Sequence, residues 1–339
     1  MSGSHRRERF AATPRAALTG AAVVAAAAML VCTPGALATT AAPATVTAPG
    51  ATADDGARVV SEKWLDDRTV DLKIDSPAAK AEMPVRLLLP RGWSKDATRT
   101  WPVLYLLQGA HDDYTSWTRE TDIEEFTADK DVITVLPSAG PTGIVTDWWN
   151  NGPNYEKFQV DELWQILRGG YRAGDKRVVA GISTGGYGAV ALAARRPGSF
   201  AAAASYSGIL STLDPGLPQL ISLLVQRENL PGDSLWGNVV FNWSNWQAHN
   251  PFALASKLRG TPLYISQGSG VSMEGDPLDA KVIESTLWIQ AHTFALRLAT
   301  LGVPVTTHFY LGAAHAWNYW QREFKASWPM LAKGLGVPA

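Results

Sequence analysis

Hydrophobic and polar positions follow two different patterns along the chain, and both indicate β-strands. The segments 58–64 and 69–74 show partial alternation of apolar and polar residues, as half-exposed antiparallel strands do. A third strand candidate, 84–89, follows them. The later candidates are short continuous apolar runs, which are typical of strands buried on both faces: 102–107, 132–136, 177–182, 201–206, 262–266 and 303–310.

Helix-like segments separate several of these runs, at 122–128, 160–167, 187–194 and 280–301. Apolar strands that alternate with helices predict a mainly parallel sheet with helices on both faces, and the early strands add antiparallel partners. This α/β arrangement is that of the α/β-hydrolase fold, which we expect for one catalytic domain at 57–339. The segment 207–257 shows no clear strand, is rich in Pro, Gly, Asn and Trp, and is expected to form a cap or one wall of a cleft.

The N-terminal part of the chain has the pattern of a secretion signal. A basic start that includes Arg6 and Arg7 precedes small and apolar residues at 16–31, and Ala36-Leu37-Ala38 resembles a cleavage site. A membrane anchor is the alternative, but the apolar run is Ala-rich, shorter than a ~20-residue span and closed by Pro34. We therefore expect a signal peptide at 1–38, a flexible Ala/Thr/Pro-rich linker at 39–56, and a secreted, extracellular or cell-envelope protein without a membrane span after cleavage. Whether export uses the general or the twin-arginine route stays open.

Composition narrows the function further. Lys and Arg number 30 and Asp and Glu 31, so no basic excess indicates a nucleic-acid partner. The single cysteine, Cys32, falls in the expected signal, which leaves the mature domain without a disulfide or a thiol nucleophile. No metal-binding motif is present, and we predict no metal and no cofactor. The 14 tryptophans fit either ordinary packing or an aromatic cleft for an acyl chain or a sugar.

The most specific local motif is Gly181-Ile182-Ser183-Thr184-Gly185, a G-x-S-x-G sequence. An apolar strand candidate precedes it and a helix of small residues follows, which is the context of a nucleophile elbow. In such a turn the serine adopts a strained conformation with its Oγ exposed, and the glycines leave room for the crossing backbone. The motif predicts that Ser183 is a catalytic nucleophile.

A serine nucleophile needs a base and an acid. In this fold the base follows the last strand, where His315 lies in a small-residue loop before a Trp-rich helix. His308 within the strand and His292 within a helix are interpreted as structural, and His249 as a residue that lines the cleft. The acid should follow the preceding strand, and loop position favours Asp276, but spacing alone does not decide among the candidates: Glu274, Asp276, Asp279 and Glu284.

The oxyanion of an acyl-transfer intermediate needs two backbone donors. One is expected at Thr184, directly after the nucleophile. The other is expected in the loop that follows the strand at 102–107, and we choose the N–H of Ala110.

Several blocks of residues resemble the esterase D family of α/β hydrolases, and within it the secreted mycolyltransferases, also known as fibronectin-binding antigens. The resemblance runs from about Pro84 to Leu335, and the matching blocks are 106–109 followed by 112–114 and Trp117, 146–149, 181–185, 213–215, 250–251 and 315–320. It implies that Glu284 is the acid, because that branch has a glutamate at the start of a helix after an Ala-Lys pair, as in Ala280-Lys281 here.

We expect substrate contacts at Gln108, His111 and Trp148, and at Trp317 as a wall of a water-excluding cleft, for which ordinary packing is the alternative. Gln108 stands where the mycolyltransferases have a sugar-contacting aspartate, and their nearby arginine has no clear counterpart. The prediction therefore covers the acyl-enzyme machinery and does not extend to trehalose.

Together these features predict a secreted serine esterase or acyltransferase with a Ser-His-Glu triad and an acyl-enzyme. Its partners would be an acyl ester of a sugar, glyceride or similar alcohol, and an acceptor alcohol or water, with association to the cell envelope. One alternative is a carboxylesterase that uses only water, because hydrolysis and transfer share every step but the last. The other is a non-catalytic extracellular binding protein on a hydrolase fold.

Overall fold

A nine-stranded mixed sheet forms the centre of the structure, a computed structural model that describes residues 50–271 and 275–339. The strand order across the sheet is β1-β2-β3-β5-β4-β6-β7-β8-β9. The strands are β1 Arg58–Trp64, β2 Thr69–Ser76, β3 Ala81–Leu88, β4 Trp101–Leu107, β5 Ile133–Pro137, β6 Ala173–Ile182, β7 Ala203–Tyr206, β8 Leu263–Gly268 and β9 Val305–Tyr310. All nine strand candidates are confirmed, with ends that differ by a few residues.

The direction of the strands follows the two hydrophobic patterns. β1, β2 and β3 pair antiparallel, and β3 also pairs antiparallel with β5. From β5 to β9 every neighbouring pair is parallel. The strands β4 to β8 are almost wholly buried because helices cover both faces of this parallel part. The predicted α/β-hydrolase architecture is confirmed.

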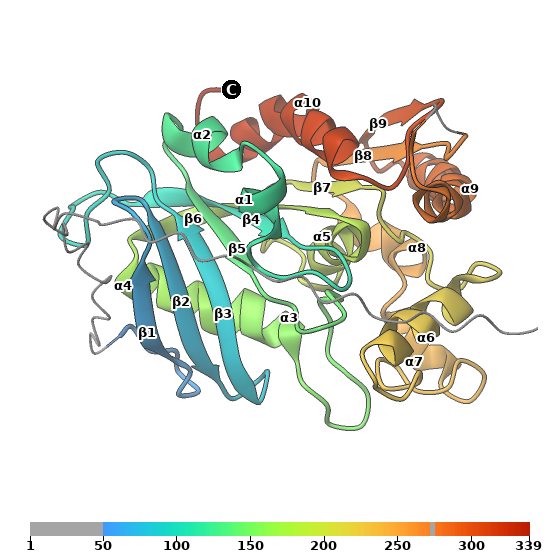
Figure 1. Ribbon diagram of the computed structural model, residues 1–339, viewed down its shortest axis with the longest axis horizontal. Helices are drawn as coiled ribbons and strands as arrows, with labels where there is room; N and C mark the ends of the chain where they lie inside the picture. The colour runs from blue at the N-terminus through green and yellow to red at the C-terminus, as the bar shows by residue number, and fades with distance from the viewer. Residues whose placement is uncertain (1–49, 272–274) are drawn as a thin grey trace, which may run out of the picture. The chain divides into compact units, whose positions relative to one another are not determined.

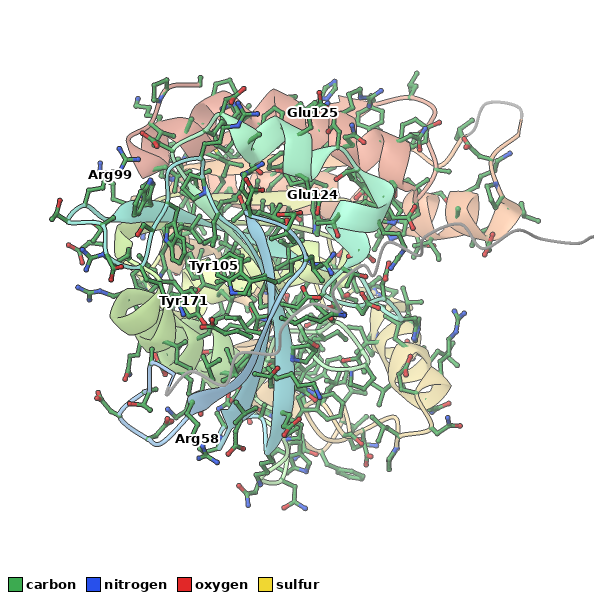
Figure 2. All side chains as sticks on the ribbon, turned by 60° about the vertical axis from the view of Figure 1, so that its left-hand side comes forward. Arg58, Arg99, Tyr105, Glu124, Glu125 and Tyr171 are labelled. Carbon is green, nitrogen blue, oxygen red and sulfur yellow. The ribbon has the colours of Figure 1, made fainter. Side chains whose placement is uncertain are left out.

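The helices divide into two layers (Figure 1). On one face, α1 Ser116–Glu120, α2 Ile123–Ala128 and α10 Trp317–Leu335 pack on the sheet through aromatic and aliphatic side chains such as Trp117, Phe324 and Trp328. The other face is covered by α3 Tyr155–Lys157, the π-helical turn η1 Phe158–Glu162, α4 Leu163–Gly170, α5 Ser183–Arg195 and α9 Leu278–Thr300. Figure 2 shows Tyr105 and Tyr171 in the interior, and Arg58 and Arg99 at the surface.

The segment between β7 and β8 contains only helices and loops, as its composition predicts. It comprises α6 Leu217–Arg227, α7 Trp243–Ala248, α8 Pro251–Leu254 and the 3-10 turn η2 Ala255–Leu258. Ile221 of α6 and Trp246 of α7 join Trp236 in a hydrophobic cluster that also contains Tyr187 of α5. The segment is therefore packed directly on the helix that begins at Ser183.

Residues 50–56, at the end of the expected linker, contact the domain. Thr52 forms an isolated bridge with Arg58, the Asp54 N–H donates to Gln165 Oε1 at 2.8 Å, and Lys157 pairs with Asp55. The expected signal peptide and residues 39–49 of the linker lie outside the described residues. In the part of the chain that the structure describes, none of the helices has the length and apolar character needed to cross a bilayer.

Candidate active site

Ser183 stands at the sharp turn between β6 and α5, with a left-handed φ of +52°. Two neighbouring glycines make this turn sterically feasible. A Cβ on Gly181 would lie 2.3 Å from the Gly185 carbonyl oxygen, and a Cβ on Gly185 would lie 2.4 Å from the Gln108 carbonyl oxygen. The backbone of β4 and its following loop thus approaches the turn as closely as atoms allow, and holds Ser183 in its strained conformation.

His315 connects Ser183 to Glu284. Its Nε2 lies 2.8 Å from Ser183 Oγ, and its Nδ1 lies 2.9 Å from Glu284 Oε2. Because a carboxylate only accepts hydrogen bonds, Nδ1 carries the proton and Nε2 is free to accept from the serine hydroxyl. The three side chains come from the β6–α5 turn, the β9–α10 loop and α9, and the His315 N–H donates to the Ala280 carbonyl, which ties the loop to α9.

Glu284 is fully buried, and hydrogen bonds hold its Oε1 as well as the Oε2 that contacts His315. Oε1 accepts from the Gly268 N–H and from Ser207 Oγ, both at 2.8 Å. Ser207 accepts in turn from Trp320 Nε1 at 3.1 Å. These bonds fix the carboxylate in one orientation, with Oε2 aimed at His315.

The other acid candidates lie elsewhere. Asp276, which loop position favours, accepts a hydrogen bond from the Tyr319 hydroxyl at 3.1 Å. Asp279 is exposed in the first turn of α9. Glu274 lies outside the described residues. Among these four, the structure brings Glu284 to His315, the residue that the resemblance implied.

Sequence reasoning missed Ser207, which was noted only as the start of the strand-free segment. It follows the carboxyl end of β7, has a left-handed φ of +50°, and lies next to Gly208. The place of a polar residue at the end of a parallel strand was the available signal, since ligands and catalytic groups gather at this edge of the sheet.

The loop after β4 carries Ala110, the expected second oxyanion donor. The Gln108 amide donates to the Asp112 carbonyl within this loop. Gly143 packs against it so closely that a Cβ there would lie 2.3 Å from the Gly109 carbonyl oxygen. The loop is therefore held from both sides. Thr184 lies in the first turn of α5, where backbone N–H groups have no acceptor within the helix.

A cavity of about 320 Å³ opens at Ser183. Its lining comes from the loop after β4, the nucleophile turn and the start of α10: Gly109, Ala110, Asp112, Ile182, Ser183, His315, Ala316, Trp317 and Trp320. Trp317 packs edge-on against both Trp117 and Trp320, with ring centroids 5.3 Å apart in each pair. This aromatic wall is rigid because three indole rings interlock.

The other three expected substrate contacts lie outside this lining. Gln108 is buried and supports the loop from within. His111 Nδ1 bonds to Glu228 at the end of α6. Trp148 packs edge-on against Tyr155, with ring centroids 6.0 Å apart.

The remaining histidines have structural partners. His249, expected to line the cleft, is buried, and its Nε2 lies 2.7 Å from Asp147 Oδ1. Burial raises the pKa of Asp147, but the hydrogen bond from His249 and the charges of His249 and Arg195 outweigh it and lower the pKa to about 2. His308 bonds to Glu323, and His292 Nδ1 lies 2.8 Å from the Trp288 carbonyl oxygen within α9.

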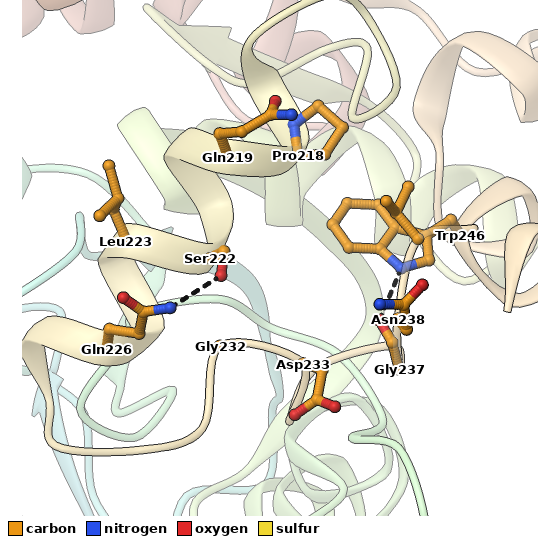
Figure 3. Close-up of a pocket in the computed structure, with 11 residues that line it drawn as sticks. Pro218, Gln219, Ser222, Leu223, Gln226, Gly232, Asp233, Gly237, Asn238 and Trp246 are labelled. Carbon is orange, nitrogen blue, oxygen red and sulfur yellow. Dashed lines mark hydrogen bonds between the residues drawn. The ribbon is translucent and has the colours of Figure 1, made fainter. Parts of the chain in front are cut away.

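A second, larger cavity of about 570 Å³ lies between α6, the loop that leads to α7, and Trp246 (Figure 3). Its walls carry Gln219, Gln226 and Asn238 together with Ser222 and Asp233, and no histidine is among its lining residues. The cavity at Ser183 differs from it in that His315 lines it together with the serine. Across residues 50–271 and 275–339, no three His, Cys, Asp or Glu side chains are grouped so that they could hold a metal ion.

The sheet topology, the elbow at Ser183 and the loops at the carboxyl ends of the strands define an α/β hydrolase. The chain belongs to the Esterase family (described as "Putative esterase"), whose pattern matches residues 76–331. Solved structures agree on the fold. The crystal structure of Mycobacterium tuberculosis MPT51 (FbpC1) has a TM-score of 0.65 at 20% identity and covers 78% of this chain and 97% of its own. The fluorophosphonate-binding serine hydrolase FphF of Staphylococcus aureus has a TM-score of 0.61 at 19% identity, with the same coverage.

Curated relatives are similar along most of the domain. Esterase Rv1288 of Mycobacterium tuberculosis is 29% identical over 273 residues, which are 75% of this chain and 57% of that protein. The chain thus matches little more than half of that relative's length. Ag85A of Mycobacterium ulcerans, a diacylglycerol acyltransferase/mycolyltransferase, is 30% identical over 258 residues, 70% of this chain and 74% of its own.

Proposed function

We propose that the protein is a secreted serine ester hydrolase or acyltransferase that forms an acyl-enzyme on Ser183. The observation that carries the proposal is the continuous chain of hydrogen bonds from Glu284 through His315 to Ser183 Oγ, at 2.9 and 2.8 Å. Membership in the esterase family and the names of the curated relatives support the same class of reaction.

The reaction proceeds in two halves. Ser183 Oγ attacks the ester carbonyl carbon while its proton passes to Nε2 of His315. The bond to the leaving alcohol breaks as Nε2 gives that proton to the departing oxygen. Water or a second alcohol then attacks the acyl-enzyme, its proton passes to Nε2 and returns to Ser183 Oγ. Glu284 keeps His315 in the required tautomer and stabilises its charged form.

The N–H groups of Thr184 and Ala110 hold the oxyanion of each tetrahedral intermediate. This assignment of the two donors is supported by the close approach of the turn at Ser183 and the loop after β4, which meet in van der Waals contact at Gly185. Removal of one such donor typically costs ~2.7–4 kcal/mol of transition-state stabilisation, so the placement of this loop contributes to rate without any side-chain chemistry.

The acyl group and the acceptor share the cavity at Ser183, with Trp317 as an apolar wall. We propose acyl esters of a sugar, glyceride or similar alcohol as substrates, with water or an alcohol as acceptor. Three of the expected binding residues do not line this cavity but support its walls. His111 and Gln108 hold the loop that carries Ala110, and Trp148 supports the packing around α5.

The first experiment is labelling with a fluorophosphonate, followed by mass spectrometry of the labelled peptide. We expect a single label on Ser183 and none in Ser183→Ala, whereas Ser244→Ala, at an exposed serine of α7, labels like the unchanged protein. Full esterase activity of Ser183→Ala would refute the mechanism. Absence of any label, together with binding to envelope components that survives Ser183→Ala, would favour a non-catalytic binding protein.

Product analysis separates hydrolysis from transfer. The enzyme is given a radiolabelled acyl ester with and without glycerol. A labelled glyceride that increases with glycerol identifies a transferase, whereas free acid at all glycerol concentrations identifies a hydrolase. A series of acyl-chain lengths on the same ester then defines the acyl group.

Secretion is tested at the N-terminus of the mature protein. We expect cleavage after Ala38, so Edman sequencing of the protein from the culture medium or cell envelope would begin at Thr39. A mature protein that still begins at Met1 would contradict the proposed signal peptide.

A further inference from the structure

Helix α9 presents an uncharged face to solvent along its whole length. Leu278, Val282, Ile289 and Leu296 are between 55% and 76% exposed. Three more exposed positions on the same face are hydroxyl residues: Ser285, Thr293 and Thr300. The opposite face carries Leu287, Phe294 and Leu298 into the core, so the exposed stripe is a second apolar surface on one helix. Figure 1 shows α9 beside β8 and β9, at the end of the sheet.

This face differs from an ordinary solvated helix surface. A surface helix normally carries charged residues opposite its buried stripe. Val282, Ile289 and Leu296 instead recur every seven residues, which is the spacing of residues that meet a partner helix. The hydroxyl groups between them donate to their own helix backbone, Ser285 to the Val282 carbonyl at 3.0 Å and Thr293 to the Gln290 carbonyl at 3.0 Å. Covering these hydroxyls would therefore leave no unpaired donor.

The stripe is nearly symmetric about Ile289. Val282 and Leu296 lie seven residues to either side, and Ser285 and Thr293 lie four residues to either side. A two-fold axis at Ile289 would run a second α9 antiparallel to the first. It would place Ile289 against its own copy and aliphatic Val282 against aliphatic Leu296, with Ser285 level with Thr293 at opposite edges of the contact. A contact made twice by one surface is the usual form of a homodimer interface.

The charges beside the stripe fit the same arrangement. At 3.6 residues per turn, Asp279 and Arg297 both lie about 80° to the same side of Ile289. Both are exposed. In the antiparallel pair, Asp279 of one copy lies next to Arg297 of the other, and the two-fold axis repeats this opposite-charge contact. In a parallel pair the two-fold axis runs along the helices and places Asp279 of one copy and Arg297 of the other on opposite sides of the contact, so this opposite-charge pair is lost.

We propose that the exposed face of α9, Leu278 to Thr300, is the contact surface for a second copy of this chain. The helix is ~35 Å long and ~10 Å wide, so the pair would bury roughly 700 Å² in total. That is below the standard size of a stable interface, so we expect a weak dimer. Glu284 projects from the inner side of the helix, so dimerisation leaves the proposed triad unchanged, and the inference does not depend on the proposed function.

The first test is sedimentation equilibrium of the mature protein from about 1 to 200 µM, with thermal melting as a check on folding. We expect concentration-dependent dimerisation in this range. Ile289→Glu should remain monomeric with unchanged activity, because this side chain is exposed on the side of α9 that faces away from the buried Glu284. The matched control is Leu223→Glu, at a 60% exposed residue of α6, which should dimerise like the unchanged protein.

Charge reversal tests the antiparallel orientation. Asp279→Arg and Arg297→Asp should each weaken the dimer several-fold, and the double variant should restore most of its affinity. Cysteine cross-linking gives an independent readout in a Cys32→Ser background, where an introduced cysteine is the only one in the chain. Ile289→Cys should form a disulfide-linked dimer with itself. Val282→Cys should do so only when mixed with Leu296→Cys.

Three outcomes would overturn the proposal. The first is a monomer at every concentration. The second is a dimer that remains intact in Ile289→Glu. The same holds for a dimer in which Val282→Cys cross-links to itself as fast as Ile289→Cys does. The third is a monomer that instead binds phosphatidylcholine/phosphatidylglycerol vesicles through this face, which would make the stripe a lipid-contact surface.

Discussion

Replacement of Glu284 by glutamine exchanges one carboxylate oxygen for an NH₂ group at constant size. The orientation of that amide is dictated by its neighbours. The Gly268 N–H and the Ser207 hydroxyl both donate to the Oε1 position, so the amide oxygen must stay there and the NH₂ group must face His315 Nδ1. Nδ1 then has to accept rather than donate, which moves the imidazole proton to Nε2.

A proton on Nε2 abolishes the function proposed for His315, because that nitrogen lies 2.8 Å from Ser183 Oγ and must take the hydroxyl proton. Loss of the correct tautomer in a serine triad reduces kcat by about 10⁴-fold, equivalent to ~5.5 kcal/mol. We therefore expect Glu284→Gln to lower kcat on a chromogenic ester by roughly 10³–10⁴-fold with little change in KM. The melting temperature should change little, since the side chain keeps its size and two of its hydrogen bonds.

The matched control is Asp276→Asn, the same chemical change at the acid that loop position favours. Its carboxylate accepts from the Tyr319 hydroxyl rather than from His315, so kcat should stay within a factor of about 3. The assignment of the acid is wrong if Glu284→Gln keeps more than a tenth of the activity, or if Asp276→Asn loses more activity than Glu284→Gln does. The pH–rate profile and the fluorophosphonate labelling rate of both variants would show whether Ser183 is still activated.

Three further predictions address the support of the site. Gly185→Ala should destabilise the protein by ~3 kcal/mol or more and abolish labelling of Ser183, because the new Cβ would lie 2.4 Å from the Gln108 carbonyl oxygen. Thermal melting measures this loss. The control is Gly169→Ala, a helical position with only an ordinary contact at 3.6 Å, where the substitution should be neutral or stabilising. Ser207→Ala removes one donor to Glu284 and should lower kcat about tenfold without changing KM, and a change confined to KM would contradict its positioning role. The pKa of Asp147 is lowered in the folded protein to about 2, so its stabilising contribution is complete above its unfolded pKa near 4 and is lost as the pH falls toward 2. The difference in melting temperature between the unchanged protein and Asp147→Asn should accordingly be constant from pH 8 to 5 and shrink below pH 4, and a constant difference down to pH 2.5 would refute the pKa shift.

Much of the fold could be predicted because the information is local. Continuous apolar runs indicated buried parallel strands, partial alternation indicated the antiparallel ones, and both patterns reflect which faces of a strand are covered. The elbow at Ser183 was equally visible, since Gly181 and Gly185 are required by contacts within the turn and with the adjacent strand. His315 followed from its place after the last strand.

The identity of the acid could not be derived from local pattern. Asp276 and Glu284 both follow β8, and loop position favours Asp276, whereas the resemblance to a known family implies Glu284. In the structure α9 packs on β8, which turns Glu284 inward under His315, while Asp276 stays with Tyr319 near the start of α10. The sequence likewise does not indicate that Ser207, 77 residues away, donates a hydrogen bond to Glu284.

The sequence by itself thus determined the strands, the turn at Ser183 and the loop that carries His315, because the steric and hydrophobic constraints on these features act between near neighbours in the chain. Only the tertiary structure decided which carboxylate meets His315, which expected binding residues reach the cavity, and which face of α9 is left uncovered. These depend on the packing of helices against the sheet, which brings together side chains far apart in sequence and leaves no periodic signal of its own.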